Sequence, residues 1–139
     1  MSINFKANIK INPNIYQGLN GEELKHIEGL VKDCVDFMEI PKVKKATQGD
    51  TLEFSKSTTR GYKNAHNIRL TFNNDAYKEP VEIDFCGFEA KKLKTGMILD
   101  QIFLYLHNVK FNIPQRFSSD HEMMRNEVIQ ELLKLDINA

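Results

Sequence analysis

Residues 3–11 alternate between apolar and polar side chains without a break. The apolar positions are Ile3, Phe5, Ala7, Ile9 and Ile11, and every position between them is asparagine or lysine. Successive side chains of a β-strand point to opposite faces, so this pattern predicts a strand with one buried and one wet face. A sheet made of such strands needs cover on one side only, which sharply limits the folds open to the chain.

Three later segments repeat the alternation. Their apolar positions are Leu52 and Phe54, then Ile68, Leu70 and Phe72, then Val81, Ile83 and Phe85. Turn-forming pairs and triplets rich in Gly, Asn and Asp separate these segments. Strands of a parallel sheet are buried on both faces, whereas alternating strands are typical of antiparallel sheets. The sequence therefore predicts four strands that are mainly antiparallel.

Three segments carry helical signals. Asn20 followed by Glu23 has the spacing of a capping box, and the apolar stripe that follows ends before Pro41. Residues 97–109 are apolar nearly all round, and Ser119 with Glu122 predicts the start of a last helix. We expect an α+β fold in the order β-α-β-β-β-α-α, a single domain over residues 1–139, with the helices packed on one face of the sheet.

The apolar runs and the cysteines indicate where in the cell the protein is located. The longest apolar run, residues 102–106, has five residues, whereas a membrane-spanning helix needs about twenty. The N-terminus has no continuous apolar stretch like the core of a signal peptide. Cys34 and Cys86 are the two cysteines and lie far apart, which is neither a disulfide framework nor a zinc spacing. We therefore expect a cytoplasmic protein with no membrane contact.

Charge is zoned along the chain although 19 basic residues balance 19 acidic ones. Residues 42–69 contain seven Lys or Arg and two acids, whereas acids dominate residues 22–39 and 75–89. Cations that neutralise phosphates, beside a tyrosine that stacks on an unpaired base, would suffice to bind single-stranded nucleic acid. The partner-binding candidates are Lys44, Lys45, Lys56, Arg60, Tyr62, Lys63 and Arg69. A solvated hairpin and a protein-binding loop are the other interpretations of this stretch.

Catalytic and metal-binding patterns are sparse. The four histidines show no ligand spacing, and residues 120–127 have Arg125 where a zinc-protease helix would need its second histidine. Glu82 and Asp84 share one face of a strand and are close enough to hold a divalent ion together. They are the basis of a hydrolase hypothesis. We expect no metal and no cofactor, and a binding protein is favoured over an enzyme.

The sequence thus favours a small non-enzymatic binding protein that blocks or modulates a macromolecular partner, most simply another protein. An immunity protein, an antitoxin or a phage-encoded inhibitor would fit, and the Lys, Asn and Ile content hints at a bacterial or phage genome. The alternative is an accessory protein that binds RNA or single-stranded DNA through the basic 42–69 region. Steep, log-linear weakening by salt would distinguish nucleic-acid binding from a protein complex.

Overall fold

The computed structural model describes residues 8–58, 64–114 and 120–138 of the 139-residue chain. The elements are β1 (Asn8–Ile11), η1 (Pro13–Tyr16), α1 (Gly21–Met38), α2 (Pro41–Ala46), β2 (Thr51–Lys56), β3 (Ile68–Asn73), β4 (Val81–Phe85), η2 (Ala90–Lys92), α3 (Thr95–Tyr105), η3 (Leu106–Lys110) and α4 (His121–Lys134). The short helices η1 and η2 are 3₁₀ turns, and η3 is a π-helical turn that continues α3.

The four strands form one mixed sheet in the order β1-β2-β3-β4. β2, β3 and β4 pair antiparallel, whereas β1 runs parallel to β2, with Ile9 opposite Leu52 and Ile11 opposite Phe54. The predicted α+β class, with a mainly antiparallel sheet, is confirmed. The parallel pair arises because the connection from β1 to β2 contains α1, and a helical crossover returns the chain to the end of the sheet where β1 began.

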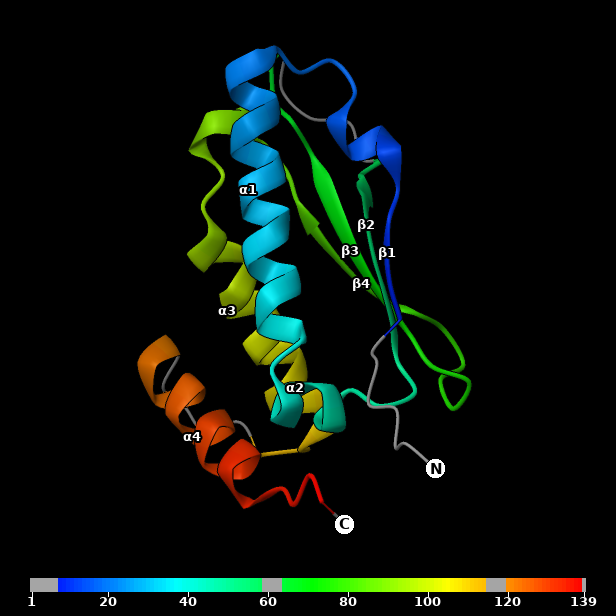
Figure 1. Ribbon diagram of the computed structural model, residues 1–139, viewed down its shortest axis with the longest axis vertical. Coiled ribbons are helices and arrows are strands. Elements are labelled where there is room, and N and C mark those ends of the chain that lie inside the picture. The colour runs from blue at the N-terminus through cyan, green and yellow to red at the C-terminus, as the bar shows by residue number, and fades with distance from the viewer. Residues whose placement is uncertain (1–7, 59–63, 115–119, 139) are drawn as a thin grey trace.

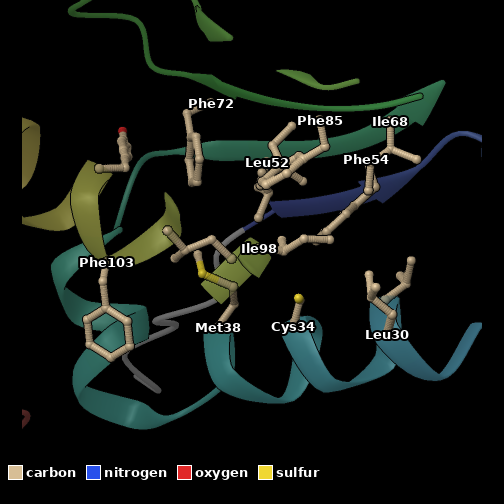
Figure 2. Close-up of a cluster of buried hydrophobic side chains, with 14 of the residues drawn as sticks. Leu30, Cys34, Met38, Leu52, Phe54, Ile68, Phe72, Phe85, Ile98 and Phe103 are labelled. Carbon is tan, nitrogen blue, oxygen red and sulfur yellow. The ribbon is translucent and has the colours of Figure 1, made fainter. Parts of the chain in front are cut away.

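The helices cover one face of the sheet, as the alternation predicts (Figure 1). Leu52, Phe54, Leu70 and Phe72 on the central strands are at most 1 % exposed. Figure 2 shows Leu30, Cys34 and Met38 of α1 directed toward this side of the sheet, with Ile98 of α3 beside them. Burying one large apolar side chain contributes about 2 kcal/mol, so this layer is the main source of stability.

The N-terminal cap of α1 is the predicted one, whereas the cap of α4 is one residue later than predicted. Asn20 and Glu23 form the predicted capping box, because Asn20 Oδ1 accepts from the Glu23 amide at 2.9 Å and Glu23 Oε1 accepts from the Asn20 amide at 3.0 Å. The N-cap of α4 is Asp120, which accepts from the Glu122 amide. Ser119 lies outside the described residues.

The last two helices, α3 and α4, pack in successive positions away from the sheet. α3 contacts α1, and α4 contacts α3 and α2 on the side away from the sheet (Figure 1). Val128 and Leu132 are the buried residues of α4, as its apolar spacing predicts. Among the helices of residues 8–58, 64–114 and 120–138, none is both long and apolar enough to cross a bilayer.

Candidate functional site: a groove beside the edge strand

Those predicted partner-binding residues that the structure describes lie on separate parts of the molecule. Lys44 and Lys45 lie on α2, and Lys45 Nζ donates to the Asp136 carbonyl after α4. Lys56 ends β2 at the opposite end of the sheet and is exposed (Figure 1). Arg60, Tyr62 and Lys63 lie outside the described residues. Their shared role stays a prediction, but α2 and Lys56 do not form one continuous patch.

Arg69 on β3 is engaged by its neighbours on β4. Its Nε donates to Asp84 Oδ1 at 2.8 Å, and its NH1 lies 3.6 Å from Glu82 Oε2. Ser57 Oγ also donates to Asp84 at 3.0 Å. The hydrogen bond from Arg69 is the main reason that the pKa of Asp84 lies below its usual range. Because two carboxylates surround this guanidinium, Arg69 offers less positive charge to a phosphate than an isolated arginine.

The same ion pairs bear on the hydrolase hypothesis. Glu82 and Asp84 lie on one face of β4, as the alternation predicts, and both contact the guanidinium cation of Arg69. In the part of the chain that the structure describes, no three His, Cys, Asp or Glu side chains gather where they could hold a metal ion. The hydrolase hypothesis therefore gains no support from this geometry.

Each histidine has a contact of the kind that structural histidines make. His26 Nε2 donates to the Leu93 carbonyl at 2.6 Å, and His66 Nε2 donates to the Ile15 carbonyl at the same distance. His107 is buried, and its Nδ1 contacts Asn108 Oδ1 at 2.8 Å. His121 Nδ1 lies 3.6 Å from Asp100 on α3.

A polar hollow of about 490 Å³ lies at the end of the sheet where β2 stops. His66 lines it, and burial lowers the pKa of this ring, which favours the neutral form. Lys56 and Lys91 also line the hollow, as do Glu23 and Glu89. Since the two cations are matched by two carboxylates, the hollow does not select for either an anion or a cation.

A buried polar cluster ties the other end of the sheet together. Asp50, just before β2, accepts hydrogen bonds from Asn74, Tyr105 and Lys110 at 2.8, 2.9 and 3.0 Å. Tyr105 gives its one hydroxyl proton to Asp50, so Tyr77 is the donor in the 2.6 Å contact between the two tyrosine hydroxyls. The donors in this cluster come from the β3–β4 turn, α3 and η3, so it joins three separate segments to the start of β2. We interpret this cluster as structural.

A groove with a largely apolar lining lies between β1 and α1. It has a volume of about 450 Å³. Its apolar lining is Ile11, Tyr16, Val31 and Val35, and Glu28, Gly29 and Lys32 complete it from α1. Val31 is 2 % exposed and forms the floor, whereas Ile11 is 41 % exposed. Burial, and secondarily the Glu28 carboxylate, raises the pKa of Tyr16, so its phenol stays protonated at neutral pH.

The sheet ends at this groove. Ile11 pairs in register with Phe54 and shares its face, yet Phe54 is fully buried while Ile11 is open to solvent. β1 is the terminal strand, and no strand among residues 8–58, 64–114 and 120–138 pairs with its outer side. The Asn12 amide donates to the Phe54 carbonyl at 2.8 Å, toward β2. Since amides alternate direction along a strand, the Ile11 amide points away from the sheet.

Comparison with known proteins gives no relative. No protein-family model matches the chain, and no match to it is found among curated proteins or solved structures.

Sequence reasoning identified none of the groove as a site. The alternation over residues 3–11 places Ile11 correctly on the apolar face, but that pattern does not say whether a neighbouring strand or helix covers it. Val31 and Val35 belong to the predicted apolar stripe of α1, and the groove arises because this stripe extends beyond the edge of the sheet. The sequence therefore identifies the apolar residues of the groove, but it does not show that they lie next to one another at the edge of the sheet.

Proposed function

We propose that this chain is a non-enzymatic binding protein that engages a protein partner at the groove between β1 and α1. The observation that carries the proposal is the open apolar groove beside β1, whose outer side pairs with no strand in the described part of the chain. Large apolar side chains that stay exposed next to unpaired backbone groups are typical of surfaces that another chain covers. We further propose that the complex forms in the cytoplasm and that binding inhibits or modulates the partner.

The charges near the groove favour a protein over a nucleic acid. Lys10 is a nearby cation and Lys32 lines the groove, but Lys32 pairs with Asp36 at 2.9 Å and the Glu28 carboxylate also lines the groove. A nucleic-acid site needs cations that track a phosphate backbone. A mixed-charge rim around an apolar floor is the usual make-up of a protein interface.

Affinity purification from a lysate of the native host tests the proposal. Wild type is compared with Ile11→Asp, which places a charge in the groove, and with Ile129→Asp, a matched control on α4. Ile129 is 39 % exposed, close to the 41 % of Ile11, and lies on the outermost helix. We expect a stoichiometric protein that survives nuclease and high salt, is lost with Ile11→Asp and is kept with Ile129→Asp.

Two outcomes would overturn the proposal. One is capture that is equal in both variants, which would place the binding surface elsewhere. The other is recovery of nucleic acid that dissociates log-linearly with salt, which would favour the basic 42–69 region as the functional site.

A further inference from the structure

From the groove and the strand edge together we infer that the partner contributes an extended segment that adds a fifth strand to the sheet beside β1. This inference rests on the proposed function and specifies the class of partner. The segment carries apolar residues at alternate positions, which enter the groove, and a carboxylate between them that lies opposite Lys10.

The backbone of β1 supplies the first half of the match. Alternate amides and carbonyls of an edge strand point outward and can pair with a further strand. The Ile11 amide and, two residues earlier, the Ile9 amide are the outward donors, because Asn12 points its amide toward β2. An extended segment offers carbonyls that accept from these amides and amides that donate to the outward carbonyls, whereas a helix uses its own amides and carbonyls internally along its length.

The groove supplies the second half. Side chains of an added strand that point toward the helical layer would lie next to Ile9 and Ile11, above Val31 and Val35. Gly29 on α1 has no side chain and open space around its Cα, which keeps this part of the groove wide enough for an incoming side chain. The groove therefore favours branched apolar residues at every second position of the segment.

Lys10 sets the character of the remaining positions. It lies between Ile9 and Ile11, on the opposite face of the strand, and is exposed. Its register partner on β2 is Glu53, with which it forms no ion pair, so the outer side of Lys10 stays open to a carboxylate on an added strand. Opposite charges on directly neighbouring strands attract, so a carboxylate next to Lys10 fits this face better than a cation.

Synthetic peptides test this inference. The probe is a fluorescein-labelled peptide of alternating Glu and Val, about seven residues long, which is the usual length of one strand. Binding is followed by fluorescence anisotropy. We expect the same peptide with Lys for Glu to bind at least about tenfold more weakly, and Lys10→Glu to reverse that preference. Lys92→Glu, on η2 at the far side of α1 from β1 (Figure 1), is the control and leaves the preference unchanged.

Two N-methylated versions of the peptide test the strand geometry itself. In each, every second amide is methylated, with the methyl groups in opposite phase. An added strand turns one set of amides toward β1 and the other toward solvent, so one version should lose binding and the other should keep it. Hydrogen exchange of the Ile11 amide should slow when the unmodified peptide is bound.

The outcomes separate this inference from the proposed function. If partner capture depends on Ile11 but both methylated peptides bind equally well, the groove is a binding site and the added strand is wrong. If Ile11→Asp has no effect on partner capture, both proposals fail together. If wild type self-associates in sedimentation and Ile11→Asp is monomeric, the groove is occupied by a second copy of the chain, which also overturns the inference. Matching circular dichroism of the variants and wild type establishes that each is folded.

Discussion

The Tyr105 hydroxyl, at the end of α3, donates a 2.9 Å hydrogen bond to Oδ2 of Asp50, just before β2. The Asp50 side chain is 1 % exposed, so its charge depends on these protein donors rather than on water. The contact spans 55 residues of sequence and joins the helical layer to the sheet.

Removing the Tyr105 hydroxyl should destabilise the fold. Tyr105→Phe keeps the ring and leaves one carboxylate oxygen of Asp50 without its donor, which should cost about 1–3 kcal/mol of unfolding free energy. Urea denaturation measures it. Tyr16→Phe is the control, because the Tyr16 hydroxyl has no hydrogen-bond partner among the described residues, and it should change stability by less than about 0.5 kcal/mol. Equal stability of Tyr105→Phe and wild type would show that Asp50 does not need this donor.

Lys110 should matter through the same carboxylate. Its Nζ lies 3.0 Å from Asp50 Oδ1, and Lys110→Met leaves a buried charge without its counter-ion. Breaking a buried pair on one side costs about 3–5 kcal/mol, and the 16 % exposure of Lys110 argues for the lower end. The double variant with Asp50→Asn should be less destabilised than the sum of the two single variants. Additivity in this cycle would mean that the two residues do not interact.

Stability should fall in mildly acidic solution because of His66. Burial lowers the pKa of the folded ring below 6.5, its ordinary value. The unfolded chain then binds more protons, so the stabilisation is full above pH about 6.5 and is lost as the pH falls toward the folded pKa, by at most about 1.4 kcal/mol per pH unit. Unfolding free energies measured between pH 7.5 and about 5 test this. His66→Gln should flatten the profile.

The two cysteines should differ in reactivity. Cys34 is fully buried in the core, and burial raises the pKa of its thiol to about 12. Cys86 is half-buried at the end of β4. Thiolate is the reactive form, so a disulfide reagent should label Cys86 in the native protein and Cys34 only on unfolding. Mass spectrometry of the single variants Cys34→Ala and Cys86→Ala identifies the site. Labelling of native Cys86→Ala at the unfolded rate would contradict the buried position of Cys34.

The cap of α1 should contribute measurable stability. Asn20→Ala removes the acceptor of the Glu23 amide and should cost about 1 kcal/mol. Asn126→Ala is a matched control in the interior of α4, where the same change replaces a weak helix former with a strong one and should be neutral or slightly stabilising. Thermal unfolding compares the two. If both variants lost the same stability, the loss in Asn20→Ala would not be due to the missing cap.

Local sequence was enough to predict which face of β2, β3 and α1 is buried, although it did not predict the short helix α2. The spacing of apolar residues alone placed Cys34 in the helix stripe and Leu70 on the covered face of the sheet, since a strand or helix has a fixed side-chain period. The capping box at Asn20 could be predicted for the same reason, because its two partners lie three residues apart.

Long-range neighbours were decided only by the tertiary structure. The alternation in β1 does not say that it is a terminal strand, that it runs parallel to β2, or that Ile11 stays exposed while Phe54 is buried. The sequence gives no sign that Arg69 has an ion-pair partner. Glu82 and Asp84 become its neighbours only when β4 pairs with β3. A local period fixes the direction of a side chain relative to its own element, whereas its neighbours depend on how the intervening chain closes. The groove beside β1 is therefore a property of the assembled fold.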